Sequence, residues 1–102
     1  MRSYKWTDTD AEIARLAGYG PDGLELAGCR EVGDGVERCD DEQADFYSAY
    51  FHFTPQPEAD QSAHRGAFCI ADRDTLDEAR AFAEEQAARW SLPVNDFVSA
   101  AP

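Results

Sequence analysis

The chain has 102 residues, of which 43% are hydrophobic and 12% aromatic, and this length and apolar content predict one folded domain over residues 1–102. Asp and Glu number 21 against 9 Lys and Arg, which gives a net charge of −12; such a charge repels nucleic-acid phosphates and anionic lipids, so direct binding to either is disfavoured. No stretch approaches the roughly 18 apolar residues of a membrane span, and "MRSYKWTDTD" has no apolar signal segment, so we expect a cytoplasmic protein without a membrane partner.

The stretch "TDTDAEIARLAG" predicts a short N-terminal helix. Thr9 followed by Glu12 forms a capping-box pattern, which satisfies the first backbone N–H groups of a helix. Ile13 and Leu16 then fall on one helical face. Gly18 is typical of the residue that ends a helix in a left-handed conformation.

Two short segments, "LELAGCREV" and "VERC", surround the turn sequence "GDG" and predict a β-hairpin. "DFYSAYFHFT" is the most aromatic segment, and both of its faces are apolar or aromatic, as in a central strand that is covered on each side. The polar loop "PQPEADQSAHRG" follows. "AFCIA" then predicts a buried strand that pairs with the aromatic one.

The stretch "DRDTLDEARAFAEEQAARW" predicts a long C-terminal helix, with Thr75 and Glu78 as a second capping box. Its apolar residues recur every three or four positions and form a stripe that faces a sheet. "VNDFV" is either a short edge strand or an ordered tail. The fold class is therefore α+β: an antiparallel sheet of three to five strands, with the short and the long helix packed on it.

Candidate catalytic groups are few. The three cysteines form no CxxC pair, and in a reducing compartment they are most simply free thiols. A disulfide between Cys29 and Cys39 across the hairpin is the alternative. An enzyme that uses Cys69 or His52 stays open as a further hypothesis. The spacing of Cys and His matches no zinc pattern, and we expect no catalytic residue, metal or cofactor.

Two segments concentrate the negative charge. Residues 31–45 carry seven carboxylates against one arginine, a net charge of −6, and residues 72–85 carry six against two, a net charge of −4. Exposed aromatic side chains beside such a surface, Tyr47 or Tyr19, would anchor a contact with a protein. The predicted partner-binding residues are Glu31, Asp34, Glu37, Asp40, Asp41, Glu42, Asp45, Tyr47, Asp72, Asp74, Asp77 and Glu78.

The stretches "EVGDGVERCDDEQADFY" and "DRDTLDEARAFAEEQ" give the chain a class resemblance. In small size, acidity and absence of a catalytic motif it resembles the anti-CRISPR and anti-restriction proteins with which phages and mobile elements inhibit host defence, several of which mimic DNA by charge. The resemblance implies a non-enzymatic inhibitor that docks on a basic, nucleic-acid-handling protein. The alternative is a housekeeping or salt-adapted domain whose acidic surface is only solvated.

Overall fold

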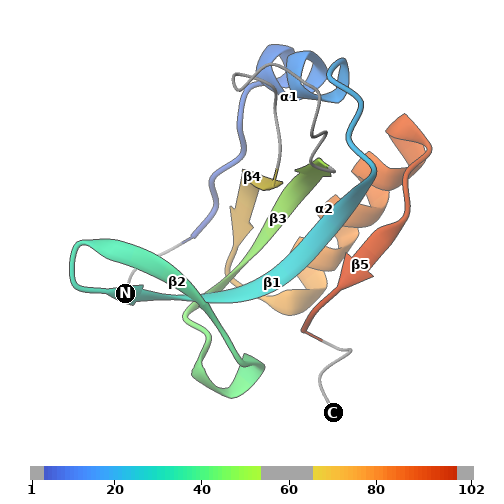
Figure 1. Cartoon of the computed structure of the whole chain (residues 1–102). Coiled ribbons are helices and arrows are strands. Elements are labelled where there is room, and N and C mark those ends of the chain that lie inside the picture. Colours follow the sequence, from blue (N-terminus) through green and yellow to red (C-terminus); the bar gives the residue numbers. More distant parts are fainter. Residues whose placement is uncertain (1–3, 54–65, 99–102) are drawn as a thin grey trace.

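The helices and strands occur in the order that the sequence predicts (Figure 1). The computed structural model describes residues 4–53 and 66–98, so most of the expected polar loop lies outside the described residues. The elements are α1 (Asp10–Ala17), β1 (Gly23–Val32), β2 (Gly35–Cys39), the 3₁₀-helix η1 (Asp41–Gln43), β3 (Phe46–Phe53), β4 (Gly66–Arg73), α2 (Leu76–Trp90) and β5 (Val94–Asp96). The α+β class is confirmed.

In the described part of the chain, five strands form one sheet. Four run antiparallel in the order β2-β1-β3-β4, and β5 pairs with β1 in parallel. The aromatic strand β3 is central, as its composition predicts, because it lies between β1 and β4. The strand count falls within the predicted range, and of the two alternatives for "VNDFV" the short strand is the one observed.

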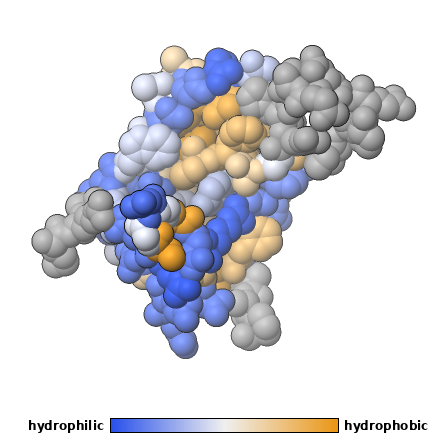
Figure 2. Space-filling view, turned by 60° about the vertical axis from the view of Figure 1, so that its left-hand side comes forward, coloured by the Kyte–Doolittle hydropathy of each residue, from blue (hydrophilic) through white to orange (hydrophobic). Residues whose placement is uncertain are grey.

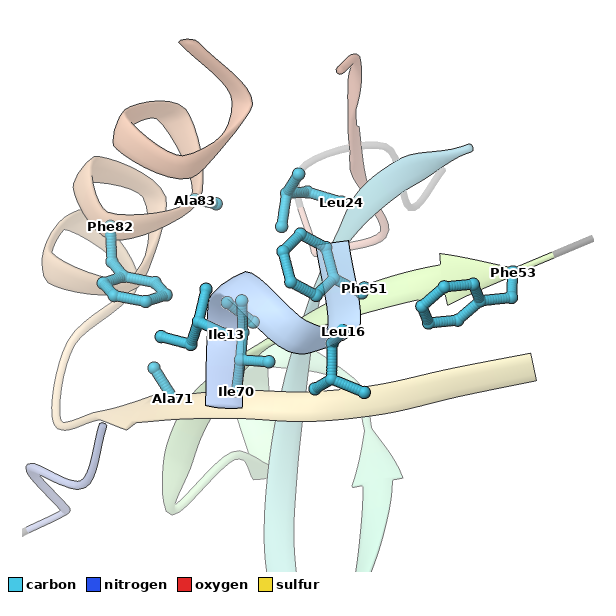
Figure 3. Close-up of a cluster of buried hydrophobic side chains, with 10 residues drawn as sticks. Ile13, Leu16, Leu24, Phe51, Phe53, Ile70, Ala71, Phe82 and Ala83 are labelled. Carbon is cyan, nitrogen blue, oxygen red and sulfur yellow. The ribbon is translucent and has the colours of Figure 1, made fainter. Parts of the chain in front are cut away.

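Both helices contribute to one apolar cluster on one face of the sheet, which Figure 3 shows from the side. Leu24 of β1 and Phe51 of β3 are direct cross-strand partners, and neither is exposed to solvent. An ion pair between Arg89 Nη1 and Asp10 Oδ1 (2.7 Å) joins the exposed sides of the two helices. The buried members of the cluster are Ile13, Leu16, Leu24, Ala49, Phe51, Phe53, Ile70, Ala71, Phe82 and Ala83.

Both helices begin at the residues that the capping patterns indicate. The Thr9 hydroxyl accepts the backbone N–H of Glu12 (3.1 Å), and the Thr75 hydroxyl accepts that of Glu78 (3.2 Å). These hydrogen bonds satisfy N–H groups that have no partner inside the helix. The end of α1 differs from the expectation, because Gly18 keeps a right-handed backbone (φ −66°) and the positive φ of 78° occurs at the next glycine along the chain.

Replacement of Phe51 by alanine tests the assignment of the core. We expect Phe51→Ala to lower the free energy of unfolding by about 3–5 kcal/mol, because it removes a fully buried ring and leaves a cavity. Phe97→Ala is the matched control, since Phe97 is 53% exposed, and it should cost less than about 1 kcal/mol. Urea unfolding followed by circular dichroism measures both, and equal losses would contradict the assignment.

Candidate functional site

The hairpin of β1 and β2 projects beyond the apolar core (Figure 1). The first seven residues of β1 are buried, whereas its last two residues and the first four of β2 are exposed. Gly33 opens the two-residue turn between the strands with a φ of 58°, a conformation that glycine adopts without steric strain. Because this part of the hairpin lies in water, it carries charged side chains without a desolvation penalty.

Tyr4 connects the two acidic segments of the sequence. Its hydroxyl donates to Glu31 Oε2 (2.9 Å), and its backbone N–H donates to Asp74 Oδ1 (2.6 Å). Its ring is stacked on Phe46, with 4.3 Å between the ring centroids. Asp45 lies in the same place, where its carboxylate accepts the backbone N–H of Glu31 (3.0 Å). Carboxylates from β1, from the residue before β3 and from the residue after β4 therefore meet at one end of the sheet.

We call this region the acidic end. The hairpin, η1 and the start of α2 all lie at the lower end of the molecule in Figure 1, whereas α1 lies at the upper end. Figure 2 brings the hairpin side forward and shows mostly hydrophilic residues over its lower part, with a small apolar patch among them and a larger apolar group nearer the top. Of the predicted partner-binding residues, the carboxylates at this end are Glu31, Asp34, Glu37, Asp40, Asp41, Glu42, Asp45, Asp74, Asp77 and Glu78.

The arginines neutralise this surface only in part. Arg38 is the one cation within residues 31–45, and its guanidinium pairs with Glu25 (2.8 Å), which is outside that segment. Arg30 pairs with Glu37 (2.5 Å) across the hairpin. Within the described residues, no ion pair engages three exposed carboxylates, those of Asp34, Asp40 and Glu42. The turn of the hairpin and the start of η1 are therefore the most strongly negative part of the acidic end.

Of the two tyrosines predicted to anchor a partner, only Tyr47 lies at the acidic end. It is half-buried, and its hydroxyl donates to the Asp41 carboxylate. Tyr19 is 53% exposed and follows α1, at the opposite end of the molecule. The exposed apolar side chains of the hairpin are Val32 (49%) and Val36 (59%). The sequence analysis missed them, because valine in a short strand is usually a sign of burial.

Asp72 differs from the other predicted carboxylates, because its side chain is engaged within the sheet. It lies on the face of the sheet that is turned away from the helices, where its Oδ1 accepts hydrogen bonds from the Ser48 hydroxyl (2.6 Å) and the Cys69 thiol (3.4 Å). Ile70 has no partner in the register of β3 with β4, so a bulge separates Cys69 from Asp72 and directs both side chains to this face. The carboxylate is half-buried and engaged within the fold.

All three cysteines are free thiols, as expected. Cys29 contacts the hydroxyls of Ser48 (3.5 Å) and Tyr50 (3.3 Å) on the same face as Asp72. The hairpin register pairs Cys39 with Gly28 and Cys29 with the next residue of β2. Successive residues of a strand point to opposite faces, so the two thiols lie on opposite sides of the hairpin and the alternative disulfide is not formed.

The environment of Cys69 is unlike that of an activated nucleophile. Burial raises the pKa of its thiol to about 12, and the neighbouring charge and hydrogen bond of Asp72 act in the same direction. The thiolate is the reactive form, so the thiol of Cys69 stays protonated at neutral pH. The other candidate catalytic residue, His52, contacts Asp22 and not a cysteine: its Nδ1 lies 2.6 Å from Asp22 Oδ1.

Comparisons with known proteins add no second line of evidence. No protein-family model matches the chain, and no curated protein or solved structure is significantly similar to it.

In residues 4–53 and 66–98, no group of three or more His, Cys, Asp or Glu side chains is placed to hold a metal ion. Neither of the described helices has the length and apolar character needed to cross a membrane. Charge and geometry therefore define the candidate site.

The hydrogen bond of Tyr47 predicts a pH effect. The Asp41 carboxylate, followed by burial, raises the pKa of Tyr47 from 10.0 to about 12 in the folded protein. A raised folded pKa stabilises the fold fully below pH 10, and this contribution is lost as the pH rises through 12. We expect Asp41→Asn to lower the pKa of Tyr47 and to move this loss to lower pH. Phenolate absorbance measures the pKa of Tyr47, and urea unfolding measures the pH at which the stability is lost. Tyr47→Phe identifies which part of the absorbance change comes from Tyr47. If Asp41→Asn left the titration curve of Tyr47 unchanged, the hydrogen bond would not be the cause of the raised pKa.

The environment of Cys69 predicts slow alkylation. With the pKa raised from 9.0 to about 12, the thiolate population at neutral pH is roughly a thousandfold smaller than that of an ordinary thiol. Iodoacetamide should therefore modify Cys69 far more slowly in the folded protein than in urea, as peptide mass spectrometry would show. Asp72→Asn should speed the reaction, because it removes the negative charge beside the thiol. Equal rates in the folded and unfolded protein would contradict the prediction.

Proposed function

We propose that the protein is a non-enzymatic binding protein whose acidic end docks on the basic surface of a nucleic-acid-handling protein and inhibits it. The mode of action is that of the anti-CRISPR and anti-restriction proteins that the chain resembles in size and charge, and its place of action is the cytoplasm. The observation that carries the proposal is the link through Tyr4, which brings carboxylates from distant parts of the sequence to one end of the sheet.

The electrostatics of the acidic end support this proposal. A surface with several carboxylates of one sign attracts a basic partner over a distance and raises the association rate, especially at low salt. The backbone N–H of Glu31 fixes the carboxylate of Asp45, and the hydroxyl of Tyr47 fixes that of Asp41. Because these groups are already held in place, less side-chain entropy is lost when a partner binds.

A solvated acidic surface, as in a housekeeping or salt-adapted domain, is the second candidate. The observation that favours it is that carboxylates also lie outside the acidic end. Glu84 and Glu85 are exposed on the second half of α2, and Asp10 is exposed at the start of α1. If the charge served only solubility, the position of a removed carboxylate would not matter, and the two candidates differ in this respect.

Two variants with the same net charge separate these candidates. Asp40→Lys with Glu42→Lys alters the acidic end, and Glu84→Lys with Glu85→Lys alters α2; each pair replaces two negative by two positive charges and changes the net charge from −12 to −8. All four residues are exposed. We expect only the first pair to slow association with a basic target, by at least about tenfold at low salt.

Affinity capture from a nuclease-treated extract of the native host supplies the target. The wild-type protein and the α2 variant should retain the same basic nucleic-acid-binding proteins, and duplex DNA should displace them. The acidic-end variant should lose them. Equal capture by all three proteins, or targets that DNA does not displace, would refute docking through the acidic end.

A further inference from the structure

Strand β2 leaves one edge of the sheet unpaired. Its register with β1 closes a two-residue turn, so the flanking pair Val32–Gly35 is hydrogen-bonded and the bonded pairs alternate from there. The alternation directs the backbone N–H and C=O groups of Val36 and Arg38 away from β1. Within the described residues no backbone hydrogen bond reaches these groups. The edge therefore presents a short row of donors and acceptors to solvent.

Charge is the main protection that the side chains give this edge. Natural proteins also shield edge strands with proline or a bulge, and β2, with the sequence "GVERC", has neither. Val36 is 59% exposed. The Arg38 guanidinium turns back to Glu25 and lies over the Tyr50 ring, 4.3 Å from its centroid. Arg30 pairs with Glu37, so the remaining charge around the edge is negative, from Asp34 and Asp40.

We propose that the free edge of β2 binds an extended basic segment of a partner protein as an additional strand. This inference rests on the proposed function and specifies which feature of the partner is recognised. The backbone groups of Val36 and Arg38 would supply hydrogen bonds, as in other cases of strand addition. The surrounding carboxylates select arginine and lysine side chains, and a second copy of this chain is disfavoured because each copy carries a charge of −12.

A peptide of alternating arginine and valine, about seven residues long and therefore able to span β2, is the probe. A matched peptide carries a methyl group on every backbone nitrogen, which preserves the charge and removes every backbone donor. Titration of the isotope-labelled protein, followed by NMR, should show protection of the Val36 and Arg38 amides by the first peptide. The methylated peptide should bind at least about tenfold more weakly, since it cannot form the ladder.

Substitution at Val36 tests the same edge from the protein side. The N–H of Val36 points away from β1, so Val36→Pro removes an edge donor and leaves the bonds of the β1–β2 ladder intact. We expect this variant to bind the unmethylated peptide about tenfold more weakly. Val36→Thr is the control, because it keeps the N–H and a branched side chain, and its affinity should stay close to that of the wild type.

The outcomes distinguish this inference from the proposed function. If both peptides bind equally and only Asp40→Lys with Glu42→Lys weakens them, charge alone recognises the partner, and strand addition is refuted while docking through the acidic end survives. If neither peptide binds at low salt, strand addition is also refuted. Sedimentation provides a further test, since a wild-type dimer that Val36→Pro dissociates would make the edge a self-interface and overturn the proposal. If Val36→Pro fails to fold, the comparison of the unmethylated with the methylated peptide still tests strand addition.

Discussion

The burial of one face of the sheet under both helices is the constraint on which the rest of the structure depends. Phe51 and Leu24 face each other across β3 and β1, and neither is accessible to solvent. A charge placed among these residues would have no partner and would cost several kcal/mol. The surplus of carboxylates is therefore confined to parts of the chain that extend past the core, chiefly the β1–β2 hairpin and η1. This explains why the most acidic segment directly precedes the most aromatic strand.

Repulsion between the concentrated carboxylates opposes folding, and local hydrogen bonds and the N-terminus of a helix offset part of this repulsion. Tyr4 donates hydrogen bonds to carboxylates of both acidic segments and stacks on Phe46. The helix N-terminus of α2 adds favourable interactions for Asp77 and Glu78, which lie in its first turn. What these contacts leave uncompensated is the turn of the hairpin and the start of η1. A basic partner would neutralise the charge there, so the least balanced part of the surface is also the part best suited to binding.

Features that depend on local sequence could be predicted, and those that depend on distant pairs could not. Capping by Thr9 and Thr75, and the central position of β3, follow from patterns a few residues long. The pairing of Arg38 with Glu25 joins residues that are 13 positions apart, so counting charges within residues 31–45 could not reveal it. The sequence analysis grouped Asp72 with the acids of the long helix and its cap, because it ended the strand at Ala71. In the structure β4 continues to Arg73, and the carboxylate of Asp72 lies against Ser48.

The carboxylates around β2 acquire a double role once the edge is considered. An exposed edge that carries an exposed valine favours pairing between identical chains. Lysine is the usual protection, but any strong charge of one sign repels a second copy equally well. Negative charge differs from lysine in one respect, because it repels this chain and attracts a basic strand. In the proposed strand addition, the acidic hairpin would keep the edge unpaired among copies of this chain and would leave it available to a partner of opposite charge. A merely solvated surface would not require the charge to lie beside the edge.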